Sequence, residues 1–428
     1  MGGIKMQLYK HQQDALEATA DRNRVAYYHD MGLGKTFTGA EKMHQLEGRV
    51  NLVICQKSKI CDWVQHFLTH YGQYFVYDLS DKRELDKFAN YDFSAFNKHI
   101  IGVINYELIF RRTELFKMSF DTILLDESSM IQNDSAKRTK AIMKLRTENV
   151  ILLSGTPTGG RYEKLYSQLR LLGWKITKRQ YWSEFVTTRQ IDMGGFKIQV
   201  VTGYKNVDRL KRKMREYGCN FLKTDEVFDL PAQTFTDVFV STSPEYRRFC
   251  KTKIATVNGV EMVGDTALTE MLYQRQLCGA YNGDKLKAFE DMLASTTDRI
   301  IIFYNFNHEL DLLKMICLDA GRPIAEVNGS TKDLAAYDDH NDSVTLIQYQ
   351  AGAMGLNLQK ANKIVYFTPP LSSELYEQSK KRTHRIGQER PCFYYRLTCK
   401  NSIEERIYET LEMRQDFTEK LFLKGGAD

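Results

Sequence analysis

The sequence at residues 27–41 reads YYHDMGLGKTFTGAE and contains a glycine-rich turn between two different patterns. Before the turn, the run RVAYY (24–28) has the β-branched and aromatic composition of a buried strand. After the turn, Phe37, Ala40 and Met43 repeat at the spacing of an amphipathic helix. A strand, a glycine-rich turn and a helix in this order are the context that a phosphate-binding loop requires.

The residues of this turn suit a bound triphosphate. Gly32 and Gly34 let successive backbone N–H groups face one anion, and the helix start adds the positive end of its dipole. Lys35 can reach the β- and γ-phosphates, and the Thr36 hydroxyl can bind Mg²⁺. The general pattern has one more glycine five residues before Gly34, where this chain has His29, which we interpret as a structural turn residue. We therefore predict an ATP and Mg²⁺ site with this turn: Met31, Gly32, Leu33, Gly34, Lys35 and Thr36.

An acidic pair follows a second strand-like run, in the sequence TILLDESS (122–129). At the end of a strand, Asp126 can hold the Mg²⁺ shell and Glu127 can orient the attacking water. The alternative is a helix N-cap, a position where Asp is common. Because the phosphate-binding turn lies about 90 residues upstream, we favour the metal and water roles.

Strand-like runs recur along the chain and group into two halves. They lie at 24–28, 51–55, 100–104, 122–126 and 150–154, and again at 299–304, 323–327, 344–348, 363–367 and 394–398. Runs that are apolar on both faces and separated by helix-length segments predict parallel α/β sheets. Residues 160–290 are rich in helix formers, with helices predicted at 207–217 and 268–277 and a connector at 229–235. We predict two α/β lobes: 1–229 with a helical protrusion at about 160–229, and 230–428 with a helical start at about 240–290 and a core at about 285–410.

The bulk composition agrees with a two-lobed soluble protein. The 428 residues are too many for one compact core, and the formal net charge of +6 is compatible with a polyanionic partner. The eight cysteines form no Cys-x-x-Cys motif, which argues against a zinc ribbon. No apolar run approaches the ~18 residues that span a bilayer, and the amino-terminal residues lack an apolar signal core. We therefore expect a cytoplasmic protein that makes no contact with a membrane.

The runs DMGLGKT, DESS, LSGTPTGG, GAMGLNL and QSKKRTHRIGQ occur in the order of the motifs of superfamily 2 helicases. The last run, followed by YYRLTCKNSIEERI, resembles the Swi/Snf-type branch in particular, and the resemblance covers about residues 8–410. It implies two tandem RecA-like lobes of the P-loop NTPase class with a helical insertion between them. It also implies DNA-dependent ATP hydrolysis, in what looks like a minimal bacterial or phage form.

The resemblance also implies roles for individual residues. Gln12 looks like the adenine-recognition residue, while Lys35, Thr36, Asp126 and Glu127 keep the roles given above. The run SGTPT (154–158) looks like the motif that couples hydrolysis to lobe movement. In the second lobe, the implied nucleotide-contacting and closing-motif residues are Gly355, Asn357, Gln378, Arg382 and Arg385, the two arginines acting as fingers on the γ-phosphate.

The finger role of the two arginines also has a chemical basis. Phosphoryl transfer spreads negative charge over the γ-oxygens, which a rigid bidentate cation stabilises. Arg382 and Arg385 are three residues apart, which places both on one face of a helix or turn. A basic run on its own is more often a solvated face, and only the other motifs reverse that interpretation.

Duplex backbones are bound by cations and by small polar groups that make no base contact. On that basis we predict nucleic-acid contacts at Lys57, Ser58, Asn105, Tyr106, Thr156, Asn305, Gly329, Ser330, Gln350 and Gly352. Trp63 lies on one side of a helix with Ile60 and Phe67, so we expect it in the core rather than as a base-stacking platform. Residues 205–215 carry six basic residues against one acid, which fits a DNA-facing protrusion and a solvated helix face equally well.

The function favoured by these motifs is a DNA-dependent ATPase that translocates on double-stranded DNA, in preference to RNA. One alternative is a strand-separating helicase, for which the sequence shows no obvious wedge. Another is an ATP-gated clamp with weak hydrolysis, because Ser128 and Ser129 stand where many relatives have Ala-His. We expect a monomer, and the sequence predicts no particular protein partner.

Overall fold

The protein is described from a computed structural model, and the description covers residues 7–91, 98–192, 197–352 and 356–422. The chain divides into two compact units, Met1–Val227 together with Asp416–Asp428, and Phe228–Gln415. The sequence placed the division near residue 230. It assigned residues 416–428 to the second lobe, whereas the described residues among them, 416–422, group with the first unit. Helix α16 (Ile403–Phe422) is continuous across that point, so no break in the helical pattern marked the change.

The first unit is built on a seven-stranded sheet that is parallel throughout, with the order β3-β4-β2-β5-β6-β1-β9. All five strands predicted here are present. The sequence missed β3 and β9, which are short edge strands with partly exposed residues. The strands are β1 (Arg24–His29), β2 (Val50–Cys55), β3 (Tyr74–Asp78), β4 (His99–Asn105), β5 (Ser119–Asp126), β6 (Arg146–Leu153) and β9 (Cys219–Leu222).

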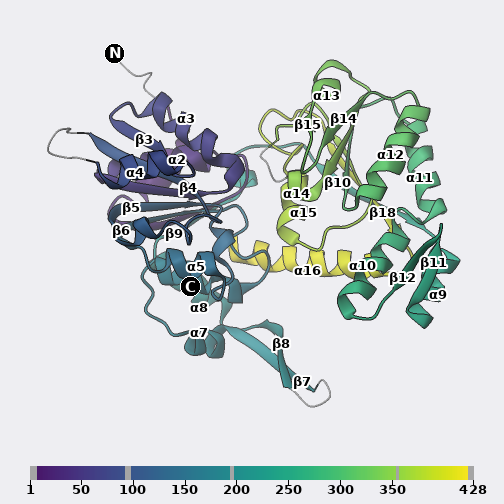
Figure 1. Cartoon of the computed structure of the whole chain (residues 1–428), viewed down its shortest axis with the longest axis horizontal. Coiled ribbons are helices and arrows are strands. Elements are labelled where there is room, and N and C mark those ends of the chain that lie inside the picture. Colours follow the sequence, from purple (N-terminus) through teal and green to yellow (C-terminus); the bar gives the residue numbers. More distant parts are fainter. Residues whose placement is uncertain (1–6, 92–97, 193–196, 353–355, 423–428) are drawn as a thin grey trace. The chain divides into compact units, whose positions relative to one another are not determined.

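Helices cover both faces of this sheet (Figure 1). One face packs against α1 (Lys10–Glu17), α2 (Lys35–Gln45) and α3 (Ile60–His70). The other packs against α4 (Lys82–Ala89), α5 (Lys137–Ile142), α6 (Tyr166–Leu171), α7 (Lys178–Phe185) and α8 (Val207–Glu216). Short 3₁₀ turns connect the elements: η1 (Lys57–Lys59), η2 (Thr113–Phe116), η3 (Ser128–Ile131), η4 (Tyr162–Leu165) and η5 (Thr224–Glu226). Because the strands are covered on both sides, they are apolar in nearly every position.

The region predicted as a helical protrusion, about residues 160–229, also contains strands, and in that respect the prediction was wrong. Strands β7 (Val186–Asp192) and β8 (Lys197–Tyr204) form an antiparallel hairpin that projects from the first unit (Figure 1). Most of its residues are exposed on both faces, so it lacks the apolar runs that reveal strands of a buried sheet. The predicted helix at 207–217 is present as α8.

The second unit contains a second seven-stranded sheet, with the order β10-β18-β17-β13-β16-β14-β15. It is parallel except for β15, which pairs antiparallel with β14. The five strands predicted here are present, and the edge strands β10 and β15 were missed. The strands are β10 (Gln233–Val240), β13 (Ile300–Tyr304), β14 (Ile324–Val327), β15 (Lys332–Asp333), β16 (Val344–Gln348), β17 (Lys363–Tyr366) and β18 (Cys392–Cys399).

The helices of the second unit again cover both faces of its sheet. One face carries α13 (Ala335–Asp339), α14 (Tyr349–Gly352), α15 (Ser373–Lys380) and α16, and the other carries α11 (Gly283–Ala294) and α12 (Asn307–Asp319). The predicted helical start contains α9 (Pro244–Thr252) and α10 (Ala267–Cys278), joined by the unpredicted hairpin β11 (Ile254–Val257) and β12 (Val260–Val263). Two tandem α/β units with largely parallel sheets confirm the predicted fold class. No helix in the described part of the chain has the length and apolarity to cross a membrane.

Candidate active site

Three neighbouring strands of the first unit end at the predicted nucleotide site. Strand β6 lies between β1 and β5, and the register places Tyr27, Leu153 and Asp126 in one row. The segments that follow these three residues therefore emerge side by side at the carboxyl edge of the sheet. In open parallel sheets this edge is where ligands bind, so the topology brings the glycine-rich turn, the acidic pair and the SGTPT run together.

The glycine-rich turn has the backbone that a phosphate-binding loop needs. Gly32 and Gly34 have φ angles of 91° and 69°, in the left-handed region that other residues avoid. Helix α2 then begins at Lys35. The Lys35 ammonium donates to the carbonyl oxygens of His29 at 2.8 Å and Asp30 at 3.1 Å, so it folds back over the turn.

His29 itself lies within β1 rather than in the turn, which corrects its predicted position. Its side chain is fully buried, and its Nε2 lies 2.7 Å from the Oδ1 of Asn220 on β9. Burial lowers the pKa of His29 to about 4, so the imidazole is neutral at neutral pH. The glycine of the general pattern is therefore replaced by a neutral side chain that joins two strands, and the phosphate turn keeps its shape.

Gln12, the predicted adenine-recognition residue, contacts the phosphate turn directly. Its Nε2 donates to the carbonyl oxygens of Leu33 at 3.4 Å and Gly34 at 3.2 Å, and its Oε1 accepts from the Tyr9 backbone N–H at 2.9 Å. A Cβ atom on Gly34 would lie 2.3 Å from that Nε2, so a larger residue there would displace the Gln12 amide, and the φ angle favours glycine in any case. These contacts tie α1 to the turn, and the contact of Gln12 with a base stays a prediction.

Two serine hydroxyl groups hold the second carboxylate of the acidic pair, Glu127. Glu127 has φ = 54° and follows the last residue of β5, which turns its side chain away from the line of the strand. Its Oε1 accepts from Ser154 Oγ at 2.7 Å and from Ser129 Oγ at 3.0 Å. Burial raises the pKa of both Asp126 and Glu127, while nearby Lys35 acts in the opposite direction.

Trp63 has a role at this site that the sequence did not reveal. It is 1% exposed, which confirms the core location, and its indole Nε1 donates to the Oδ2 of Asp126 at 2.9 Å. Tyr106 is also fully buried, and its hydroxyl donates to the backbone carbonyl of Asp126 at 2.9 Å. The proposed metal ligand is therefore oriented by one residue of α3 and another that follows β4.

We expect Trp63→Phe to lower the kcat for ATP about tenfold, with little change in the KM for ATP, and to raise the Mg²⁺ concentration needed for half-maximal rate. A hydrogen bond to a charged group contributes about 1.5–3 kcal/mol, and phenylalanine keeps most of the packing but removes the donor. Steady-state kinetics at varied Mg²⁺ measure both effects. Trp182→Phe is the matched control, because the Trp182 Nε1 is buried without a hydrogen-bond partner in the described residues. Equal kinetics for the two variants would contradict the role given to Trp63.

Gln168 connects these segments, and no motif pointed to it. This fully buried residue of α6 accepts hydrogen bonds at Oε1 from Tyr28 at 2.9 Å and Ser128 at 2.8 Å. Its Nε2 donates to the carbonyl oxygen of Pro157 at 2.8 Å. One amide therefore bridges β1, the turn after the acidic pair and the SGTPT run. The only signal in the sequence was a polar residue in an otherwise apolar stretch close to these motifs. Such a signal is weak, because the sequence does not show that the residue is buried.

The second unit brings its predicted arginines together. Arg382 and Arg385 lie in the turn after α15, and the Nη1 atoms of both point to the carbonyl oxygen of Leu356, at 3.5 and 3.4 Å. Gln388 Nε2 donates to the carbonyl oxygens of Ala361 at 2.9 Å and Gln359 at 3.1 Å, which holds the turn against the segment before β17. Burial lowers the pKa of Arg385, yet a guanidinium stays charged at neutral pH.

For the other residues of this unit that were predicted to contact nucleotide, the structure gives no supporting contact within the described residues. Asn357 is exposed, and Gln378 is 6% exposed with its Nε2 at 3.5 Å from the Glu374 carboxylate. Gly355 lies outside the described residues. A contact of Asn357 or Gln378 with nucleotide therefore stays a prediction.

Comparisons with known proteins agree with this geometry. Residues 11–282 match the SNF2-related domain family, and residues 284–387 match the helicase conserved C-terminal domain. The chain belongs to the SNF2-related family. This confirms the Swi/Snf-type resemblance of its motifs, whereas a bacterial or phage origin stays a prediction.

Individual relatives of this SNF2-related chain are distant. It is 22% identical over 427 residues to the SWI/SNF-related matrix-associated actin-dependent regulator of chromatin subfamily A member 1 of Mus musculus. It is 25% identical over 440 residues to the ISWI chromatin-remodeling complex ATPase ISW1 of Saccharomyces cerevisiae. Each match covers 90% of this chain but only 40% and 38% of the relatives, so the chain spans about two fifths of their length. A solved structure, the SWI2/SNF2 ATPase core of Sulfolobus solfataricus in complex with dsDNA, aligns with a TM-score of 0.44 and 20% identity over 97% of this chain and 93% of that one.

The residues predicted to contact nucleic acid differ in how far they are exposed to solvent. Five are exposed and available for phosphate contact: Lys57, Ser58, Gly329, Ser330 and Gln350. Gly352 ends α14, and its exposure is not described. Asn305 is half-buried, and its side-chain amide donates to the Thr368 hydroxyl at 2.8 Å and to the Pro369 carbonyl at 3.1 Å.

The other three predicted contacts are buried. Asn105, Tyr106 and Thr156 are 4%, 0% and 5% exposed. Each follows or lies near a strand end, where polar side chains support the acidic pair and the SGTPT run as readily as they contact a phosphate. The Tyr106 hydroxyl in particular already donates a hydrogen bond to the backbone carbonyl of Asp126. These residues lie in the interior of the SNF2-related first unit, and their contact with nucleic acid stays a prediction that this burial does not favour.

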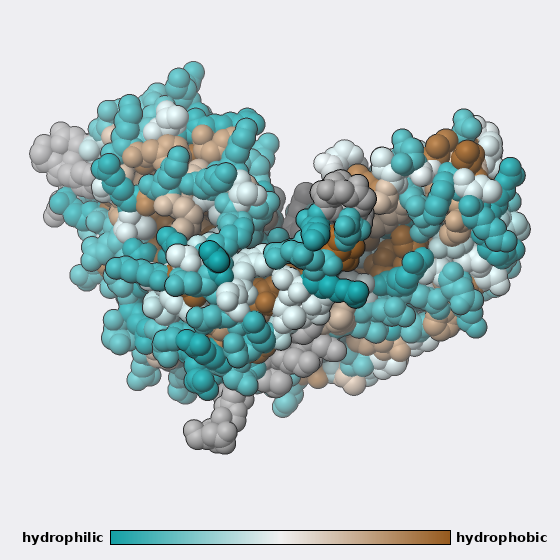
Figure 2. All heavy atoms as spheres, turned by 90° about the horizontal axis from the view of Figure 1, so that it is seen from below, coloured by the Kyte–Doolittle hydropathy of each residue, from teal (hydrophilic) through white to brown (hydrophobic). Residues whose placement is uncertain are grey.

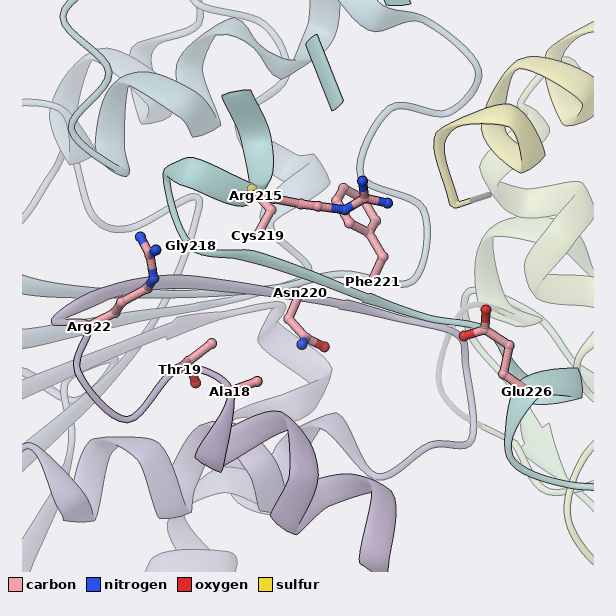
Figure 3. A pocket seen from close by; sticks show the side chains of 9 residues that line it. All are labelled: Ala18, Thr19, Arg22, Arg215, Gly218, Cys219, Asn220, Phe221 and Glu226. Atoms are coloured by element: carbon pink, nitrogen blue, oxygen red, sulfur yellow. The ribbon is translucent and has the colours of Figure 1, made fainter. Parts of the chain in front are cut away.

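A pocket of about 260 Å³ lies apart from the phosphate turn, along the outer edge of β9 (Figure 3). Its walls include Arg22 and Arg215, and Asn220 joins it to His29 of the SNF2-related core through the hydrogen bond described above. Sequence reasoning did not predict this pocket. It holds none of the residues assigned to ATP, so it is not the nucleotide site.

Proposed function

We propose that this chain is a DNA-dependent ATPase that couples ATP hydrolysis to translocation on double-stranded DNA. The observation that carries the proposal is the convergence of Lys35, Glu127 and Ser154 at the carboxyl ends of three adjacent strands. A Cβ on Gly155, the residue after Ser154, would lie 3.4 Å from the Lys35 Nζ, so the SGTPT run lies close beside the phosphate turn. Membership of the SNF2-related family supports the same reaction.

The residues present fit a triphosphate with Mg²⁺. The turn supplies backbone N–H groups at a helix start together with Lys35, which is the donor set for phosphate. Thr36 and Asp126 would hold the Mg²⁺, which supplies charge neutralisation at the phosphates when it is bound. Burial raises the pKa of the Asp126 and Glu127 carboxyls, and a divalent cation beside them would favour their ionised forms.

Glu127 is suited to accept a proton from the attacking water. Its Oε1 accepts two hydroxyl hydrogen bonds, while its Oε2 makes no hydrogen bond within the described residues. Two donors on one oxygen favour the ionised carboxylate, which a general base requires. Because Ser129 is one of these donors, one residue of the serine pair supports the base directly, and we do not favour the weakly hydrolysing clamp.

We propose that Arg382 and Arg385 stabilise the charge that develops on the γ-phosphate. Arg385→Ala is expected to lower DNA-stimulated kcat about a hundredfold, below the 10³–10⁵ range of a single arginine finger, because Arg382 remains. The duplex Kd, measured without nucleotide, should change less than about twofold. The matched control is Arg390→Ala, because Arg390 donates to the Lys360 carbonyl in the same segment but is exposed. Wild-type turnover by Arg385→Ala would remove it from the finger role.

Double-stranded DNA is the substrate we favour over single strands and RNA. The exposed predicted contacts, Lys57, Ser58, Gly329, Ser330 and Gln350, are a cation and small polar groups suited to phosphates rather than to bases. Aromatic platforms for unstacked bases are a hallmark of single-strand binding. Trp63, on the helix that follows the Lys57–Lys59 turn, is buried in the core and offers no such platform.

ATP turnover with different nucleic acids tests this function. Duplex DNA, single-stranded DNA and duplex RNA of the same length should be compared at saturating concentration. We expect duplex DNA to raise kcat about tenfold or more, and the other two to raise it less. Lys35→Ala provides the blank for contaminating ATPases. Equal turnover with and without nucleic acid would contradict the proposal, and a preference for duplex RNA would replace DNA as the substrate.

A further inference from the structure

The positive charge of the chain is concentrated in one segment, residues 175–217, which we call the protrusion. It contains eleven Lys and Arg residues against four Asp and Glu, a net charge of +7. The whole chain has a formal net charge of +6, so the remaining residues together carry −1. An excess of this size in one tenth of the chain repels itself unless an anion neutralises it.

The protrusion is a folded module of the first unit rather than a loose tail. It consists of α7, the β7–β8 hairpin and α8. Lys205 N donates to the Phe185 carbonyl at 3.1 Å, Asn206 Nδ2 to the Glu184 carbonyl at 2.8 Å, and the Tyr204 hydroxyl to Glu163 at 2.6 Å. Its apolar side chains Tyr181, Phe185, Leu210 and Met214 are buried in the core of the first unit. The apolar faces of the two helices are thus turned inward, and most of the cations are left outside, with Lys211 as a buried exception.

The acids of the protrusion are largely occupied. Glu184 pairs with Arg209 at 3.3 Å, and Glu216 pairs with Lys213 at 2.6 Å. Asp208 lies 3.9 Å from Lys211. Seven further cations are exposed and make no ion pair within the described residues: Lys175, Arg179, Arg189, Lys197, Lys205, Arg212 and Arg215. Figure 3 shows the Arg215 side chain extended beside that of Phe221, a residue of β9.

The surface around these cations is largely polar, although Ile191 and Val200 of the hairpin are 42% and 40% exposed. Gln190 and Gln199 face each other across the hairpin as register partners, and both are exposed. Amides and hydroxyls are common partners of phosphate oxygens, and a two-stranded ribbon fits a duplex groove. Figure 2 views the molecule from the side toward which the hairpin points in Figure 1, and most of that face is hydrophilic. An acidic protein surface would more often meet cations set among apolar anchors.

We propose that the protrusion is an additional binding surface for the phosphate backbone of duplex DNA, outside the helicase motifs. None of its residues was among the predicted contacts, and residues 205–215 were left undecided between a DNA-facing and a solvated role. The inference rests on the proposed function, because it takes duplex DNA as the nucleic acid that the ATPase acts on. The surface holds the duplex through charge, so its contribution is independent of base sequence and falls with salt.

The test is the affinity for a short duplex, measured without nucleotide over a range of salt concentrations. The variant Arg189→Gln/Lys205→Gln/Arg212→Gln should bind about 10- to 100-fold more weakly at about 100 mM salt, and its slope of log K against log [salt] should be shallower by about 2–3. The matched control Lys82→Gln/Arg83→Gln/Lys117→Gln removes the same charge from exposed cations elsewhere on the first unit that form no ion pair with any described residue. It should behave like the wild type. Equal affinities and slopes for the two triple variants would overturn the proposal.

Two further measurements separate this inference from folding and from the proposed function. Because the substituted side chains are exposed and unpaired, the thermal unfolding midpoint should not change. In the wild type, duplex DNA should protect Lys197 and Lys205 from an amine-reactive reagent but leave Lys82 and Lys117 reactive, and no protection would overturn the proposal. DNA-stimulated kcat at saturating duplex should be retained by the triple variant. If the wild type shows no stimulation at all, the proposed function fails, while the salt slopes still decide the role of the protrusion.

Discussion

Replacing Lys35 with alanine is expected to lower ATP turnover at least about a thousandfold while leaving the protein folded. The Lys35 ammonium lies over the phosphate turn, where it donates to the carbonyl oxygens of His29 and Asp30. A triphosphate offers this cation stronger, charged acceptors than two carbonyls, and the attraction grows as charge develops on the γ-phosphate. Steady-state ATP hydrolysis with saturating duplex DNA measures the loss.

The matched control for this variant lies on the same helix. Lys42 is 1% exposed, and its Nζ also donates to a backbone carbonyl, that of Thr19 at 2.6 Å. Lys42→Ala removes the same side chain and a comparable hydrogen bond, so it reports the cost in stability alone. We expect Lys42→Ala to unfold at lower temperature but to keep the turnover of its folded fraction. If Lys35→Ala kept more than about a tenth of wild-type turnover, the phosphate role of the turn would be wrong.

Replacing Glu127 with glutamine is expected to lower turnover about a thousandfold with ATP binding largely intact, since a general base contributes about 10²–10⁴. Glutamine has the same shape and keeps an oxygen that can accept from Ser129 and Ser154. It lacks only the ability to take the proton. Equilibrium binding of a fluorescent ATP analogue together with single-turnover hydrolysis separates the two properties. Near-normal hydrolysis by Glu127→Gln would assign the base elsewhere.

Ser154→Ala tests the same base in a milder way, through the pH dependence of kcat. Burial raises the pKa of Glu127, and the Ser154 hydroxyl lowers it by donating to the ionised carboxylate. A base must be ionised, so turnover is lost as pH falls through its pKa. Removing the hydroxyl raises that pKa, and the acid limb of kcat should move to higher pH. An unshifted limb would show that Ser154 does not hold the carboxylate in the reacting state.

Much of the fold was predictable because both sheets are buried on both faces. Every strand between two others, such as β2 or β13, is an apolar run that a periodicity argument detects. The missed strands are edges or exposed hairpins, such as β9, β10 and the β7–β8 pair. Their residues alternate weakly or not at all, because a strand that packs on one neighbour only, or on none, carries little apolar signal.

The candidate site was predictable only where a motif fixes both residue and backbone. The turn at Lys35 and the pair Asp126 and Glu127 have that property, since their roles depend on local geometry. Trp63 and Tyr106 show the limit. A buried aromatic residue looks the same in sequence whether its polar atom is solvated or directed at a carboxylate, and only the register of β2, β4 and β5 places these two beside Asp126.

Displacement of the third strand from a DNA triplex tests most directly whether hydrolysis moves the protein along an intact duplex. The substrate is a duplex with a third strand bound at one end, incubated with ATP and either wild type or Lys35→Ala. We predict that the wild type releases the third strand only when ATP is present, that Lys35→Ala releases none, and that the two strands of the underlying duplex stay paired. Separation of the duplex strands, or ATP hydrolysis without release of the third strand, would contradict translocation on double-stranded DNA.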